Sequence, residues 1–289
     1  MFSLYLILAV FVGLLQAKSS TGDSVLVILD SKLNRSDYSL FFGSLEGTCE
    51  EELMFHFFEP PVAEQGYSLT FRAPGDSTPA IKEYEAPNFD HVIVFAPYTK
   101  STLYSDSSVK VLTDLGTLDF SSDITPQSLV SLLEKGTNLL LALSQKQNLV
   151  NSLANEFSLI LPPPQTPLVS HFPEREESAT VIPITPQPNV LVGPDLPPVW
   201  FSGIPVALGS NPLLFPILRA PAESFASDAT ADSGADSVLE AADRGGEGLW
   251  AGSSLSLVTG FQTRGGARAT WVGGVELFSD DFAKKNALR

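Results

Sequence analysis

The sequence predicts an α/β fold: an open parallel sheet, followed by a β-rich and proline-rich segment. Two continuous apolar runs of strand length, residues 25–29 and 139–143, are typical of strands buried on both faces of a parallel sheet. Segments with helical periodicity alternate with such runs, as they do in βαβ units. From residue 162 the helical periodicity disappears, and prolines are frequent up to Pro221.

Four strands are predicted in the first half of the chain. The first is Val25–Leu29 and the fourth is Leu139–Leu143, both rich in leucine or β-branched residues. Between them, Tyr67–Phe71 and His91–Phe95 also have the pattern of strands. We therefore expect an α/β domain with right-handed crossovers over residues 24–160.

Three helices are predicted between these strands. The first has its apolar side chains at i, i+3, i+4 and i+7 over residues 38–45, with Ser36 as its N-cap. The second opens at Thr125–Pro126 and closes at Lys135–Gly136, which are favourable start and stop signals. The third covers residues 150–157 and ends before a run of three prolines.

Residues 46–65 interrupt this alternation. They separate a predicted helix from the strand that should follow it, whereas connections in α/β units usually have about 2–6 residues. We interpret this stretch as an atypical insertion. One hypothesis is that it is unspliced or misannotated coding sequence, which transcript sequencing would decide.

The second half of the chain, residues 161–289, is predicted to be a β-rich segment. Ser254–Phe261 and Ala267–Val275 read as a β-hairpin around residues 262–266. Residues 226–248 are rich in Asp, Ala, Ser and Gly and are interpreted as a mobile loop. A last helix is expected to start within Leu277–Phe282.

The N-terminus predicts a secretory signal peptide at residues 1–17. Phe2–Leu15 is apolar and uncharged, and it is shorter than the roughly 20 residues that a spanning helix needs. Leu15–Ala17 is an acceptable cleavage site, although an uncleaved anchor is the alternative. Asn34-Arg35-Ser36 is a glycosylation sequon, so Asn34 is a candidate acceptor in a secreted chain.

Composition excludes several classes of function. The net charge is 17 − 33 = −16, which argues against general affinity for nucleic acid and against a basic membrane-binding patch. The single cysteine, Cys49, excludes an internal disulfide framework and a cysteine-cluster metal site.

Two polar residues follow predicted strands, where open parallel sheets bind their ligands. Asp30 would then orient a ligand and Ser144 would act as a nucleophile. The favoured interpretation is that Asp30 binds turn amides and that Ser144 is a polar loop residue. A nucleophile elbow needs glycines on both sides, and Ala142 and Lys146 occupy those positions.

The remaining candidates for chemistry are weak. Cys49 follows a helix instead of a strand, and Glu51 stands where an elbow needs its second glycine. The acidic neighbours of Cys49 would disfavour its thiolate. Asp280 and Asp281 are expected to cap the helix that follows them. The three histidines, which show no metal-ligand spacing, are His56, His91 and His171. We therefore expect no catalytic, cofactor-binding or metal-binding residues.

Two groups of segments together have the pattern of a known family. The more specific group lies in the second half: Gly260–Arg264, Ala267–Arg268 and Gly273–Phe282. The group in the first half is Val25–Asp30, Ser39–Leu45, Gly66–Phe71, Phe89–Pro97 and Ile124–Pro126. In order and spacing these segments resemble the forty-eight-kilodalton subunit family of oligosaccharyltransferase over residues 24–285.

This resemblance implies a non-catalytic subunit of an endoplasmic-reticulum membrane complex. The complex transfers an oligosaccharide from dolichyl diphosphate to Asn in Asn-X-Ser/Thr, and the resemblance places catalysis in a separate STT3-type subunit. It implies a type I topology with the α/β and β-rich parts in the lumen, no cofactor on this subunit, and partners among the other subunits. The family's C-terminal domain and membrane helix would lie beyond Arg289.

Two other classes of function stay open. The first half also resembles amidotransferase-like members of the flavodoxin-like folds, so the runner-up is an α/β hydrolytic enzyme of the secretory pathway. A third reading is a secreted carbohydrate-binding module that uses Trp200, Trp250 and Trp271, although such scattered tryptophans are more typical of core residues.

Overall fold

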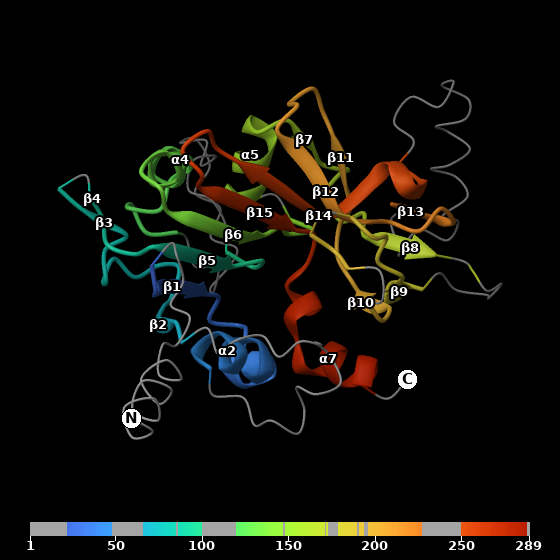
Figure 1. Cartoon of the computed structure of the whole chain (residues 1–289), viewed down its shortest axis with the longest axis horizontal. Coiled ribbons are helices and arrows are strands. Elements are labelled where there is room, and N and C mark those ends of the chain that lie inside the picture. The colour runs from blue at the N-terminus through green and yellow to red at the C-terminus, as the bar shows by residue number, and fades with distance from the viewer. Residues whose placement is uncertain are drawn as a thin grey trace, which may run out of the picture.

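The structure is a computed structural model. It describes residues 22–47, 66–84, 86–99, 120–146, 148–170, 172, 179–189, 191–193, 196–226 and 250–287. The predicted leader, nearly all of the 46–65 insertion with Cys49 and His56, His171 and the loop over 227–248 lie outside these ranges. The fold is α/β and is built on one nine-stranded mixed sheet, which has a parallel part and an antiparallel part (Figure 1).

The four strands predicted in the first half are confirmed. They are β1 (Ser24–Leu29), β2 (Ser68–Arg72), β5 (His91–Phe95) and β6 (Asn138–Ala142). β1 pairs in parallel with both β2 and β5, and β5 pairs in parallel with β6. Leu26, Val27 and Ile28 of β1 are fully buried, so both faces of this strand are covered as the apolar run predicts.

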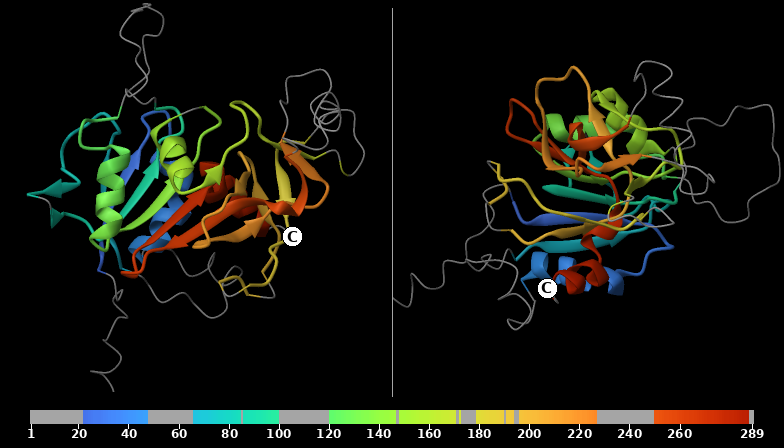
Figure 2. Two further views of the ribbon diagram at one scale, coloured as in Figure 1. Left: turned by 90° about the horizontal axis from the view of Figure 1, so that it is seen from above. Right: turned by 90° about the vertical axis from the view of Figure 1, so that its right-hand side faces the viewer.

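Helices cover both faces of the parallel strands (Figure 2). α4 (Pro126–Glu134) and α5 (Leu149–Glu156) pack on the face that carries Leu26 and Ile28. The other face, with Val25 and Val27, packs against Tyr38 of the 3₁₀ helix η1 (Arg35–Tyr38) and Phe42 of α2 (Ser39–Glu46). This alternation follows the period-2 arrangement of side chains along β1.

The start of α4 agrees with its sequence signals, whereas the start of α2 does not. Thr125 Oγ1 accepts from the Ser128 amide at 3.1 Å, and Ser128 Oγ accepts from the Thr125 amide at 2.8 Å, which forms a capping box. The predicted N-cap Ser36 is wrong, because it lies inside η1 and α2 starts only at Ser39.

The second half of the chain continues the same sheet. The predicted hairpin is present as β14 (Leu255–Gln262) and β15 (Arg268–Val272). β15 also pairs in parallel with β6, and the sheet order is β2-β1-β5-β6-β15-β14-β11-β7. The predicted boundary between residues 160 and 161 therefore falls at the end of a strand within one sheet. The remaining strands of the sheet are β7 (Leu159–Ile160), β11 (Val206–Leu208) and β12 (Leu214–Arg219).

Smaller elements complete the described part of the chain. The short antiparallel pairs are β3 (Lys82–Glu83) with β4 (Ala86–Pro87), β8 (Leu168–Ser170) with β13 (Ser224–Ala226), and β9 (Ile182–Ile184) with β10 (Val199–Phe201). The last elements are η3 (Gly252–Ser254), η4 (Val275–Phe278) and α7 (Asp280–Ala287). Across the described ranges, none of the helices has the length and apolar character needed to cross a bilayer.

Candidate functional site

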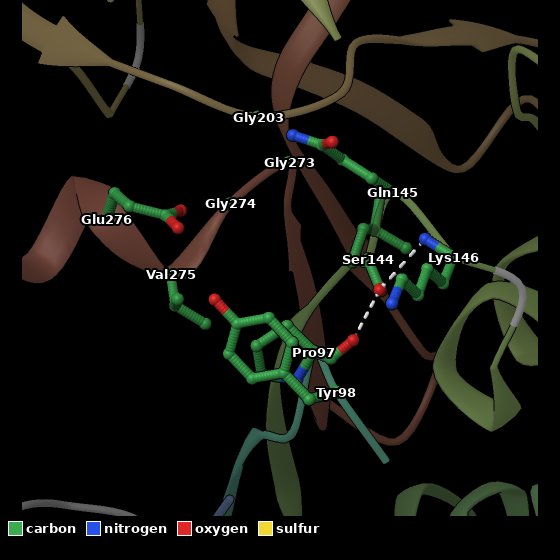
Figure 3. A pocket seen from close by; sticks show the side chains of 11 residues that line it. Pro97, Tyr98, Ser144, Gln145, Lys146, Gly203, Gly273, Gly274, Val275 and Glu276 are labelled. Atoms are coloured by element: carbon green, nitrogen blue, oxygen red, sulfur yellow. Dashed lines mark hydrogen bonds between the residues drawn. The ribbon is translucent and has the colours of Figure 1, made fainter. Parts of the chain in front are cut away.

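A cavity of about 150 Å³ lies beyond the carboxyl ends of β5, β6 and β15. Open α/β sheets bind their ligands at this edge. Pro97 and Tyr98 after β5, residues 143–146 after β6 and residues 273–276 after β15 line the cavity, together with Gly203 (Figure 3). Residues from both halves of the chain therefore form this pocket.

Glycines shape one wall of the pocket through close backbone contact. A Cβ at Gly273 would lie 2.1 Å from the carbonyl oxygen of Ile204, and one at Gly274 would lie 2.2 Å from that of Ser202. The Ile204 amide donates to the Gly273 carbonyl at 2.8 Å. Only glycine permits this approach, so the Gly-Gly pair after β15 holds the two segments together.

Ser144 lies in the pocket wall, but its hydroxyl is already engaged. Its Oγ donates to the Pro97 carbonyl at 2.5 Å and accepts from the Lys146 amide at 3.1 Å (Figure 3). The Ser144 amide donates to Asn151 Oδ1 at 3.0 Å. Since the hydroxyl proton points to a carbonyl and no described histidine contacts it, Ser144 has the geometry of a residue that joins two loops.

Asp30 joins the ends of β1 and β5 in a similar way. It is 3% exposed, and its carboxylate accepts from the amides of Lys32 at 3.1 Å and Tyr98 at 3.0 Å. The Thr99 hydroxyl also donates to it, at 3.1 Å. These contacts are the turn-amide role favoured from the sequence, and they fix the loop that presents Tyr98 to the pocket.

The pocket carries an acid on one side and an amine on the other. Figure 3 shows Glu276 facing the cavity opposite Ser144 and Lys146. Burial raises the pKa of Glu276 above its ordinary value. Burial also raises the pKa of Tyr98, and the nearby charges of Glu276 and Asp30 raise it further. The arrangement can donate and accept hydrogen bonds, but these residues do not form a nucleophile–base pair.

His91, the one histidine among the described residues, lies at the amino end of β5, at the end of the strand away from the pocket. It starts β5, and its ring nitrogens lie 3.2 Å from Asn138 Nδ2 and 3.3 Å from the Gly22 carbonyl. Within the described ranges, no group of three His, Cys, Asp or Glu side chains is arranged to hold a metal ion.

Asp280 has a role that the sequence analysis missed. It was expected to cap the helix that follows it, but Ser279 Oγ accepts from the Phe282 amide at 3.4 Å and takes that position. The Asp280 carboxylate instead accepts from Ser39 Oγ at 2.6 Å and from the Leu40 amide at 3.0 Å. Asp280 therefore caps α2 from 240 residues away, and no local sequence signal could have indicated this.

The three tryptophans occupy different positions. Trp271 on β15 is 1% exposed, and its ring centroid lies 5.0 Å from that of Phe157. Trp200 on β10 is partly buried, and the centroid of its ring lies 5.8 Å from Lys285 Nζ. Trp250 is partly buried against the core cluster that contains Leu255 and Leu257 of β14. Trp271 is thus a core residue.

Fold and pocket together define a class of protein: an open-sheet α/β protein whose strand-end pocket contains no paired nucleophile and base among the described residues. The family model described as "OST48, N-terminal domain" matches residues 16–289, and the chain belongs to this family. The resemblance found in the sequence is thereby confirmed.

Curated relatives extend this result to several eukaryotes. A Caenorhabditis elegans protein is 25% identical over 93% of this chain and 53% of its own length. Proteins from Danio rerio and Drosophila melanogaster are 25% and 24% identical over 93% and 92% of this chain. All three are named "Dolichyl-diphosphooligosaccharide--protein glycosyltransferase 48 kDa subunit". The chain spans about half the length of these relatives.

One solved structure has a similar fold. The "mmIFT52 N-terminal domain" covers 91% of both chains with a TM-score of 0.52 and 10% sequence identity. This likeness concerns the fold alone.

Proposed function

We propose that this chain is a non-catalytic subunit of the oligosaccharyltransferase complex of the endoplasmic reticulum. It supports transfer of oligosaccharide from dolichyl diphosphate to Asn in Asn-X-Ser/Thr, and it acts on the lumenal side of the membrane. The family match over residues 16–289 is the observation that carries this proposal. The names of the curated relatives indicate the complex and its lipid-linked donor.

The contacts in the strand-end pocket support a non-catalytic role. The Ser144 hydroxyl is hydrogen-bonded to the Pro97 carbonyl and the Lys146 amide. The Asp30 carboxylate accepts from the amides of Lys32 and Tyr98 and from the Thr99 hydroxyl. Both groups therefore join loops to one another, which stiffens the carboxyl edge of the sheet. In this proposal, bond formation takes place on a separate STT3-type subunit, and the chain contributes a rigid surface for its neighbours.

The test uses cells depleted of their own forty-eight-kilodalton subunit. This chain, expressed there with an affinity tag, should co-purify with the catalytic subunit in mild detergent and should raise glycosylation of a reporter glycoprotein. If the tagged chain accumulates in folded form but the catalytic subunit is absent from the purified sample, the proposal is wrong.

A glycine variant that should disrupt the fold is compared with a glycine variant that should leave it intact. Gly273→Ala should abolish both readouts, because its Cβ would meet the Ile204 carbonyl at 2.1 Å. Gly265→Ala lies in the β14–β15 turn, where its Cβ would meet only Thr263 Oγ1 at 3.8 Å, and should change neither readout.

Ser144→Ala distinguishes the scaffold from the runner-up hydrolase. A scaffold should keep both association and reporter glycosylation in this variant. A hydrolase activity of the purified chain that is lost in Ser144→Ala, while the variant folds and associates normally, would favour an enzyme with Ser144 as its nucleophile.

A further inference from the structure

We propose that Asn34 is an acceptor of an N-linked glycan, and that the exposed surface of η1 therefore faces solvent in the assembled protein. The inference rests on the lumenal location in the proposed function, since the transferring enzyme works there. It concerns a modification of this chain and not its role in the complex.

The sequence offers one place for such a modification. Asn34-Arg35-Ser36 is the one Asn-X-Ser/Thr triplet in the 289 residues, and its middle residue is not proline. Any N-glycan of this type on the chain therefore has to be at Asn34.

The fold presents the two recognised side chains of the sequon to solvent. Asn34 and Ser36 are both exposed. Asn34 has an extended backbone, with φ −88° and ψ 129°, and its side chain makes no capping hydrogen bond to η1. Its amide nitrogen has one long contact, 3.5 Å to Asp37 Oδ2, so little is lost when it is modified.

The middle residue of the sequon is attached to the protein. The Arg35 guanidinium lies 4.0 Å from the centroid of the Phe71 ring on β2, and its Nη2 lies 3.2 Å from Glu46 Oε1 on α2. Arg35 therefore holds the turn against the fold, while its two neighbours stay accessible.

The lipid-linked donor supplies both the glycan and the leaving group for the reaction at Asn34. The bond between Asn34 Nδ2 and the anomeric carbon forms as the bond from that carbon to the diphosphate oxygen breaks. The dolichyl diphosphate leaves with the electron pair, and the amide nitrogen releases one proton. A bulky polar glycan at this point would exclude a partner subunit from the exposed side of η1.

The test expresses the full chain with its own leader in eukaryotic cells, carrying a C-terminal tail with an independent sequon. The tail reports arrival in the lumen. Glycans are detected as gel-mobility shifts that are reversed by an amidase that removes N-glycans, and the modified peptide is identified by mass spectrometry. The wild-type chain should carry two glycans, and Asn34→Gln should carry only the tail glycan.

Two Ser36 variants act as a matched pair at the second recognised position. Ser36→Ala should lose the Asn34 glycan, whereas Ser36→Thr should keep it. Because Asn34 is exposed, Asn34→Gln should unfold at the same temperature as the deglycosylated wild-type chain, which rules out misfolding as the cause of the loss.

The outcomes separate this inference from the proposed function. A glycosylated tail with an unmodified Asn34 overturns the acceptor site and leaves the lumenal location standing. If neither position is modified, the chain does not reach the lumen, and both proposals are wrong.

Discussion

The Arg72 side chain is fully buried, and its charge is paired with the Asp123 carboxylate. Its guanidinium contacts Asp123 at 2.8 and 3.2 Å, and it also donates to the Pro79 carbonyl at 2.6 Å. Burial alone would raise the pKa of Asp123, but the hydrogen bonds from Arg72 and Ser121 outweigh it and hold that pKa below its usual value. The ion pair therefore joins the end of β2 to the loop before α4.

Asp123→Ala should lower the free energy of unfolding at pH 7 by about 3 kcal/mol, because it leaves a buried guanidinium unpaired. A carboxyl with a lowered folded pKa stabilises the protein above its unfolded pKa of about 3.9. That stability is lost as the pH falls through the folded pKa. Urea unfolding at several pH values should show the difference between wild type and variant shrinking below about pH 4.

The exposed pair Arg35–Glu46 provides the control for this prediction. Its side chains are 55% and 30% exposed, so Glu46→Gln should cost less than about 1 kcal/mol. Equal losses for the two pairs would contradict the role assigned to burial.

The pKa shift of Glu276 has the opposite sign to that of Asp123. Burial raises its folded pKa, so its ionisation destabilises the folded protein as the pH rises above the unfolded pKa. Glu276→Gln should therefore increase the free energy of unfolding at pH 7, and this gain should vanish below about pH 4. Exposed Glu223, changed to Gln, should stay within about 0.5 kcal/mol of wild type at both pH values. A loss of stability in Glu276→Gln at pH 7 would mean that its carboxylate has an anionic role in the pocket.

At the scale of elements, α2 depends on the last helix of the chain. Asp280 at the start of α7 supplies the acceptor for Ser39 Oγ and the Leu40 amide, because Tyr38 at the N-cap position makes no side-chain cap. The ring of Phe278 in η4 also lies 4.6 Å from that of Phe41 in α2. The segment 275–287 and α2 therefore form one packed layer below the sheet (Figure 1).

Asp280→Ala should lower the free energy of unfolding by about 1–3 kcal/mol, because two donors at the start of α2 lose a buried acceptor. Asp281→Ala removes the adjacent carboxylate, which is exposed, and should cost less than about 1 kcal/mol. Chemical denaturation followed by far-UV circular dichroism measures both. Equal losses of stability in the two variants would mean that Asp280 acts only as a negative charge near the N-terminus of α7 and does not cap α2.

At the scale of the whole molecule, β15 connects the two halves of the chain. It pairs in parallel with β6 and antiparallel with β14, and Ala269 and Trp271 belong to the main core cluster together with Leu139 and Leu141. Without β15, the β6 edge and one side of this core would be open to water.

A fragment of residues 22–161 should therefore show no cooperative thermal unfolding, whereas the whole chain should unfold in one transition. Adding the fragment of residues 162–289 should restore cooperative unfolding if β15 supplies the missing edge. A 22–161 fragment that unfolds cooperatively by itself would instead support an independent α/β domain over residues 24–160.

Local patterns predicted most of the parallel half. The apolar run of β1, the capping signals of α4 and the β14–β15 hairpin all depend on neighbours within a few residues, and the structure confirms each of them. The prediction for Ser36 was wrong because residues 35–38 form η1, and the acceptor at the start of α2 is Asp280, which local sequence patterns do not reveal. The pocket could be placed at the carboxyl ends of the strands, but Glu276 and the Gly273–Gly274 wall were not predicted as parts of it.

The sequence by itself determined the α/β class, four strands of the parallel sheet and the family, since these follow from side-chain periodicity and short motifs. The tertiary structure alone decided that β15 lies beside β6 and that Asp280 caps α2. Both contacts join residues more than a hundred positions apart, and their stability comes from burial and hydrogen bonding that exist only after the sheet has assembled.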